Sequence, residues 1–305
     1  MNRPAAIPSG NLAGIGMMLL GMLMFSLNDV LGKWLVGTYS VGQVLLFRSV
    51  AALIVLAPFV LRAGWTAFRT APQPFLQVLR AALSTLEVAC FYWAVSGLPL
   101  ADVMAYYLAA PIFVAALSAV LLKEAVGPLR WAAVLVGFAG VVVVLQPSAG
   151  ALSLYSVVAV AGSMIFSCLM IATRHLRGTS SMVLVSTQVM GALIFGAFTA
   201  PFAWVQPSAP HVGMLALLGA VALAAILLVN RSLRLAPASV VVPYQYTLII
   251  WAVLFGYLFF GDRPQLHMLV GAAIIIGSGL LTFLREQQLR RNGSAGQPPP
   301  DYDGP

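Results

Sequence analysis

LAGIGMMLLGMLMFSLNDVL, residues 12–31, indicates what kind of structure this chain forms. Its length matches a bilayer, because roughly 20 helical residues at about 1.5 Å each cross about 30 Å of hydrocarbon. Its apolar side chains are continuous and do not alternate with polar ones, which predicts a helix and not a barrel strand. We therefore expect a membrane-spanning helix near the beginning of the chain.

Further stretches have the same length and character. We place them at 43–61, 75–96, 102–122, 128–145, 152–172, 182–201, 212–230, 238–260 and 266–284. The composition agrees, since 61% of the 305 residues are hydrophobic and 8% are charged, against about 45–50% and about 25% in soluble proteins. The predicted fold class is an all-α integral membrane protein with ten transmembrane helices.

The basic residues divide unequally between the two sides of these helices. Lys33 and Arg263 fall on one side and Arg48 lies inside the second helix, whereas the other Lys and Arg residues fall on the side of the N-terminus. Cytoplasmic loops are enriched in Lys and Arg, so we expect an inner-membrane protein with both termini cytoplasmic. Residues 1–11 are then a cytoplasmic segment, and the polar, proline-rich residues 285–305 a disordered cytoplasmic tail.

The two halves of the sequence resemble each other. A shift of 141 residues superposes Gly21 on Gly162, Phe25 on Phe166, Ser26 on Ser167 and Ala51 on Ala192, and a shift of 138 superposes Tyr106 on Tyr244 and Glu124 on Asp262. Each half holds five predicted helices, an odd number, so the second half enters the membrane from the opposite side. We predict two inverted five-helix repeats, 12–146 and 151–284. Chance similarity between apolar sequences is the alternative.

Several short motifs resemble the EamA-type drug/metabolite transporter family. They are the segment from Phe25-Ser26 to Lys33, Leu-Pro-Leu-Ala at 98–101, Leu-Leu-Lys-Glu at 121–124 and Leu-Ala-Pro-Ala-Ser at 235–239. The resemblance covers about residues 12–284. It implies alternating-access transport of small metabolites through a central cavity between the halves, and within the family the YddG-type exporters of aromatic amino acids are closest in character.

Enzymatic and nucleic-acid functions find no support in the sequence. It holds no nucleotide-binding or metalloprotease motif, and His175, His211 and His267 lie far apart, so we predict no enzyme activity, no metal and no cofactor. The net charge is +8, but the basic residues are scattered along the sequence in ones and twos and do not form a stripe that would bind nucleic acid. The predicted partners are therefore a small-molecule substrate and the lipid bilayer, with no nucleic acid.

Ionisable residues inside the predicted helices are candidate functional residues, because burying such a charge in a bilayer costs at least ~2.5–3.5 kcal/mol. Glu87 lies near the middle of the third helix, on one stripe with Arg80, Ser84 and Phe91. This predicts a site for a substrate ammonium group or a coupling proton. An interhelical hydrogen bond or an ion pair with Arg80 is the alternative.

Polar residues near the ends of the first two helices lie at comparable depth. We predict a structural ion pair between Asp29 and Arg48, which lowers the cost of burying both charges. Asn28 is then left to line the cavity.

Aromatic residues concentrate on the third, fourth and ninth predicted helices and predict a cavity wall for a flat or amphipathic solute. Packed or lipid-facing aromatics are the alternative. The predicted substrate-binding residues are Phe25, Asn28, Glu87, Phe91, Tyr92, Tyr107, Tyr244 and Trp251.

Prolines and small residues complete the candidates. Pro111 and Pro243 each remove a backbone hydrogen bond and predict hinges, with static bends as the alternative. Two pairs of small residues permit close helix packing within the bundle, or a homodimer through the same faces: Ala133 and Gly137 on the fifth helix, and Ala273 and Gly277 on the tenth.

The sequence as a whole predicts a carrier that exports small metabolites, with amino acids, including aromatic ones, as the first candidates. Two alternatives stay open. One is an importer of a larger metabolite, of the riboflavin or S-adenosylmethionine type, on the same fold. The other is a membrane-embedded protein that does not transport.

Overall fold

The structure is a computed structural model of the chain and describes residues 9–64, 66–121, 128–145, 153–176, 178–236 and 238–295. Every regular element within these ranges is a helix. Seven helices among the described residues are long and apolar enough to cross a membrane. Three shorter apolar helices lie at Leu100–Val114, Val134–Val144 and Leu266–Leu281. These segments account for the ten helices that the hydropathy of the sequence predicts.

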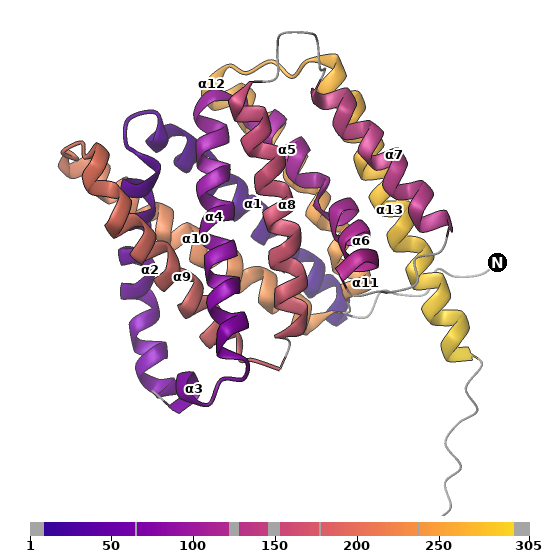
Figure 1. Ribbon diagram of the computed structural model, residues 1–305, viewed down its shortest axis with the longest axis horizontal. Coiled ribbons are helices and arrows are strands. Elements are labelled where there is room, and N and C mark those ends of the chain that lie inside the picture. The colour runs from indigo at the N-terminus through magenta and orange to yellow at the C-terminus, as the bar shows by residue number, and fades with distance from the viewer. Residues whose placement is uncertain are drawn as a thin grey trace, which may run out of the picture.

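The elements follow one another along the chain as shown in Figure 1. The first half holds α1 (Ser9–Val36), α2 (Val41–Ala63), α3 (Thr66–Arg69), α4 (Pro74–Gly97), α5 (Leu100–Leu108), α6 (Ala110–Leu121) and α7 (Pro128–Leu145). The second half holds α8 (Leu154–His175), α9 (Ser181–Thr199), η1 (Ala200–Ala203), α10 (Ala209–Leu235), α11 (Ala238–Val241), η2 (Val242–Tyr246), α12 (Thr247–Phe260) and α13 (Leu266–Ala295).

The last helix corrects the predicted disordered tail 285–305. α13 continues to Ala295, because the Arg, Glu, Gln and Leu residues of 285–291 are good helix formers that extend it beyond the apolar part. The predicted segment 1–11 also loses residues to a helix, since α1 begins at Ser9. Residues 1–8 and 296–305 lie outside the described residues.

The predicted fourth and ninth helices are both broken. The fourth is divided at Ala109 into α5 and α6, just before Pro111, and the ninth begins as α11 and the 3₁₀ turn η2, which contains Pro243. Proline cannot donate the backbone hydrogen bond that continues a helix. Both prolines therefore lie at real breaks, and their action as hinges stays a prediction.

The two breaks differ in how their polar groups are satisfied. At the first, Ser163 and Ser167 of α8 donate hydrogen bonds of 2.8 and 3.1 Å to the carbonyl oxygens of Tyr106 and Ala110. Ser26 of α1, the counterpart of Ser167, is buried and its hydroxyl has no hydrogen-bond partner. Ser167 thus bonds the first break to α8, whereas its equivalent, Ser26, makes no such bond in the other half.

Helix packing follows a pattern that is unchanged when the halves are exchanged. α1 packs on α10 as α8 packs on α4, and α12 packs on α1 as α6 packs on α8. α2 pairs with its own counterpart α9, and α7 with α13; the last two lie side by side along one edge of the bundle in Figure 1. Two similar five-helix units produce this pattern when they face each other.

Glycines mark two equivalent crossings in this pattern. A Cβ atom at Gly21 would come within 2.9 Å of Val229 on α10, and one at Gly162 within 3.0 Å of Cys90 on α4. These are the two glycines that the 141-residue shift superposes. The close approach of the paired helices therefore depends on matched small residues.

The small-residue faces of the fifth and tenth predicted helices behave differently. Gly137 packs inside the bundle, where it faces Ile112 of α6 and Ser278 of α13. Ala273 and Gly277 lie on the outer surface of α13, and the side chain of Ala133 lies outside the described residues. A homodimer through these faces stays a prediction.

Candidate functional site

Three charged side chains from three helices lie close together inside the bundle. Asp29 of α1 is 7% exposed and accepts a 3.1 Å hydrogen bond from the Asn28 amide. Arg48 of α2 interacts electrostatically with Asp29 and with Glu87 of α4. The Arg48 guanidinium also donates a 2.5 Å hydrogen bond to the hydroxyl of Tyr92. Charges at such positions are costly in a membrane helix and mark functional sites.

The direct ion pair predicted between Asp29 and Arg48 does not form in this structure. Among pairs of described residues, the opposite charges within 4.0 Å of each other are Lys33 and Asp262. Arg48 instead turns toward Tyr92, with the guanidinium 5.4 Å from the centre of the ring. Asp29 and Arg48 are hydrogen-bonded to neutral neighbours, Asn28 and Tyr92, and the charge of Arg48 acts on Asp29 from beyond 4.0 Å.

Arg80 does not pair with Glu87 either. Its guanidinium donates to the Thr173 hydroxyl at 2.9 Å, to the Leu184 carbonyl at 3.0 Å and to Gln188 at 3.3 Å. These bonds join α4 to α8 and α9. The Glu87 carboxylate has no hydrogen bond among the described residues, and its role in binding a substrate or a proton stays a prediction.

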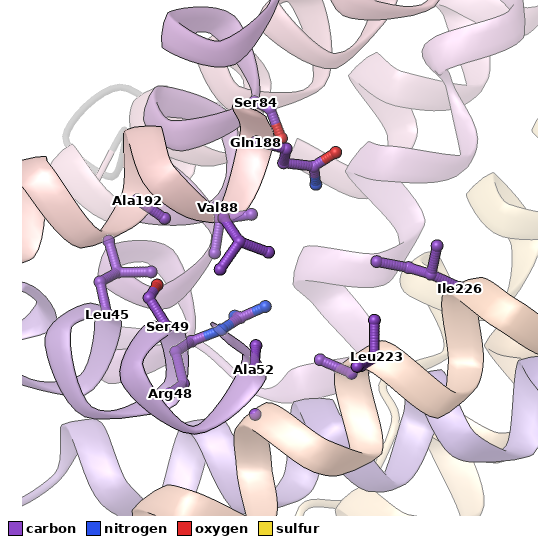
Figure 2. Close-up of a pocket in the computed structure, with 13 residues that line it drawn as sticks. Leu45, Arg48, Ser49, Ala52, Ser84, Val88, Gln188, Ala192, Leu223 and Ile226 are labelled. Carbon is purple, nitrogen blue, oxygen red and sulfur yellow. The ribbon is translucent and has the colours of Figure 1, made fainter. Parts of the chain in front are cut away.

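A cavity lies beside Arg48, between α2, α4, α9 and α10 (Figure 2). The guanidinium points into this space, with Leu223 and Ile226 across the gap and Ser84 and Gln188 near one end. The cavity holds about 40 Å³, which is room for a few water molecules. This space is too small for an organic metabolite, which enters it only when these helices separate.

Several buried polar atoms in the described part of the chain have no hydrogen-bond partner. They are Ser26 Oγ, Asn28 Oδ1, Ser84 Oγ, Thr179 Oγ1 and Trp251 Nε1, and of these residues Ser84 lines the Arg48 cavity. A buried polar atom left without a hydrogen bond costs about 1–3 kcal/mol. The Ser84 hydroxyl is therefore free to bind a solute or water in the cavity.

The predicted aromatic residues on α4 and α5 pack beside Glu87. The ring of Phe91 meets those of Tyr92 and Tyr107 edge to face, with centroids 5.8 and 5.4 Å apart. The Tyr107 hydroxyl donates to the backbone carbonyl of Glu87 at 3.1 Å. Tyr107 therefore joins α4 to α5 and does not offer a free hydroxyl to the cavity.

The other predicted aromatic residues form a second group. Phe25, Tyr244 and Trp251 pack around the buried side chains of Met18 and Met22. Phe25 lies one turn before Asn28 on α1, which connects this group to the charged residues. The predicted site residues are thus brought together in two adjoining groups, one charged and one apolar.

Sequence reasoning missed a contact that joins the two halves at one end of the bundle. Lys33 Nζ, at the end of α1, lies 2.9 Å from an oxygen of Asp262, which follows α12. It also donates to the Leu98 carbonyl at 3.1 Å. The sequence carried a signal for this pair, because Lys33 is nearly alone on its side of the predicted membrane and Asp262 takes the place of Glu124 in the repeat. Glu124 itself lies outside the described residues.

An apolar cluster closes the cavity on another side. Leu56 of α2, Val185 of α9 and Leu223 of α10 are buried against one another. A second cavity of about 390 Å³ lies on the far side of this cluster, where Asn230, Arg231 and Arg234 line it. Members of the cluster line both cavities, so it forms the wall between the Arg48 cavity and a basic mouth.

The sequence profile of the EamA-like transporter family matches this chain twice, over residues 12–146 and 153–284. The chain belongs to the EamA-like transporter family. It is therefore a multi-pass membrane transporter, and the described helices are those of an EamA-like fold.

Named relatives cover nearly the whole length of this EamA-like transporter. An S-adenosylmethionine uptake transporter of Rickettsia bellii is 27% identical, over 90% of this chain and 94% of the relative. A riboflavin transporter of Rhizobium johnstonii is 27% identical, over 94% and 95%. A pseudopaline exporter of Pseudomonas aeruginosa is 25% identical, over 87% and 93%. None of these three is an exporter of aromatic amino acids.

A solved crystal structure supports the fold. It superposes on this EamA-like transporter with a TM-score of 0.60 and 18% sequence identity, and covers 92% of this chain and 98% of the solved one.

Proposed function

We propose that this EamA-like transporter takes up an organic metabolite of the S-adenosylmethionine or riboflavin type by alternating access. The observation that carries the proposal is a group of three charged residues, Asp29, Arg48 and Glu87, which have no ion pair within 4.0 Å among the described residues. Arg48 lines a cavity inside the bundle, and the two carboxylates interact with its charge. Transporter sites lie between the two repeats and use broken helices. The breaks at Ala109 and in η2 fit such a site.

Uptake takes the place of the amino-acid export that the sequence suggested. The S-adenosylmethionine uptake transporter supports the direction, and this relative together with the riboflavin transporter supports the kind of solute. In the proposed orientation both termini are cytoplasmic, so the Lys33–Asp262 end faces outward and the basic mouth faces inward. Rocking of the two five-helix units opens one end at a time.

Counterflow in proteoliposomes tests the proposal. Purified protein is reconstituted in vesicles loaded with S-adenosylmethionine or riboflavin, and the entry of labelled solute is followed. We expect exchange of at least one of the two solutes. Well-folded protein that exchanges neither of them would contradict the proposal.

Glu87→Gln is expected to lower this exchange at least about tenfold. The variant keeps the size of the side chain but removes its charge, and a hydrogen bond to a charged group contributes about 1.5–3 kcal/mol. Initial exchange rates at equal protein content measure the effect. Glu286→Gln, near the end of α13, is the matched control and should exchange like the unmodified protein; equal rates for both variants would remove Glu87 from the site.

A further inference from the structure

We infer that the solute carries an amino-acid head group, whose carboxylate binds to Arg48 and whose ammonium group binds between Asp29 and Glu87. This inference rests on the proposed function and names the chemical class of the solute in that same site. It separates the two kinds of solute named there, because S-adenosylmethionine carries such a head group and riboflavin does not.

Arg48 is the residue that binds the carboxylate of the solute in this inference. A guanidinium has five N–H donors in a planar fork that matches a carboxylate. One recorded hydrogen bond uses this fork, the one to Tyr92, and no described carboxylate lies within 4.0 Å of it. Because the group also points into the cavity, its remaining donors are placed to receive a carboxylate from a solute.

Asp29 and Glu87 provide the cation-binding side. Both carboxylates interact with the charge of Arg48 and with each other, yet neither has a described cation within 4.0 Å. Carboxylates accept hydrogen bonds, and an ammonium group supplies up to three donors. A solute that carries both a carboxylate and an ammonium group therefore provides a carboxylate for Arg48 and an ammonium group for Asp29 and Glu87.

The second half of the chain offers no equivalent charges. Under the two repeat shifts, Arg48 corresponds to Val189, Asp29 to Met170 and Glu87 to Ala225. The wall across the cavity from Arg48 is likewise apolar, with Leu223 and Ile226. At these three positions only the first half carries charges, so the head group is assigned to the first half and the apolar wall of α10 to the less polar remainder of the solute.

Two analogues, each lacking one charge of the head group, test the inference. They are S-adenosylmethionine without its carboxylate and S-adenosylmethionine with a keto group in place of the amine. Each competes with labelled S-adenosylmethionine in the proteoliposomes. We expect each to inhibit the unmodified protein at least tenfold less well than S-adenosylmethionine does.

Variants assign each charge to its residue. In Arg48→Gln we expect the analogue without a carboxylate to inhibit as well as S-adenosylmethionine does, while discrimination against the keto analogue remains. In Glu87→Gln and Asp29→Asn we expect the keto analogue to inhibit as well as S-adenosylmethionine does, while discrimination against the analogue without a carboxylate remains. Arg62→Gln, exposed at the end of α2, is the matched control for Arg48 and should keep both discriminations. Size-exclusion profiles verify that each variant is folded.

The outcomes separate this inference from the proposed function. Exchange of riboflavin without competition from S-adenosylmethionine would overturn the head-group inference and leave the proposed uptake standing. Inhibition of the unmodified protein by both analogues that is as strong as inhibition by S-adenosylmethionine would also overturn it, even where no variant folds. An absence of exchange for both solutes would instead contradict the proposed function.

Discussion

Gly219→Ala is expected to destabilise the protein strongly and to abolish transport. Gly219 of α10 faces the backbone of α2, and a Cβ atom there would collide with the carbonyl oxygen of Arg48 and lie 3.1 Å from Ala51 Cβ. A backbone carbonyl cannot rotate away as a side chain can, so α10 and α2 must separate. Overpacking of this kind costs about 1–3 kcal/mol or more. The unfolding temperature in detergent, with transport in parallel, measures the effect.

Gly213→Ala on the same helix is the matched control. A Cβ atom at Gly213 meets nothing within 4 Å. In a helix, alanine is more favourable than glycine by about 0.8–1.0 kcal/mol, so this variant should be as stable as the unmodified protein or more so. If both variants unfolded at the same temperature, the close contact between α10 and α2 would be wrong.

Asp262→Lys is expected to open the end of the bundle that Lys33 and Asp262 hold closed. The substitution replaces a 2.9 Å ion pair with two like charges, which repel each other. A cysteine introduced at Ala222, which is buried and lines the Arg48 cavity, reports the opening. In protein with Cys90 and Cys168 replaced by serine, we expect its labelling by a membrane-impermeant maleimide, added from outside, to accelerate at least tenfold.

Exchange of the two charges provides the control for this experiment. Lys33→Asp combined with Asp262→Lys restores an opposite-charge pair at the same place, so labelling should slow again toward the unmodified rate. If labelling of the single variant stayed slow, the Lys33–Asp262 contact would not close this end. If it stayed fast in the double variant, the charges would not be what closes it.

Helix positions could be predicted from the sequence, whereas side-chain partners could not. Apolar length determines where a helix crosses the membrane, and the two prolines mark the breaks in the fourth and ninth helices. Arg48 was expected to meet Asp29 because both lie at similar depth. Its actual partner, Tyr92, depends on the rotation of α2 against α4, and one residue changes a side chain's direction on a helix by about 100°.

The substrate was harder to predict than the scaffold. Helix lengths and glycine crossings are requirements of the fold and recur whatever is transported. The charged residues that we assign to the solute are few, and they occupy positions that are apolar in the second half. Family resemblance therefore indicated the architecture while it pointed to the wrong class of relatives, and only the unpaired charges around Arg48 distinguish one solute chemistry from another.

The small size of the cavity beside Arg48 affects how tightly a solute can bind. Room for only a few water molecules does not admit an organic metabolite, so a solute binds there only after the surrounding helices have separated. Part of the binding free energy of a solute is used to separate the helices. The apparent dissociation constant is therefore the intrinsic one divided by the fraction of molecules that are already open.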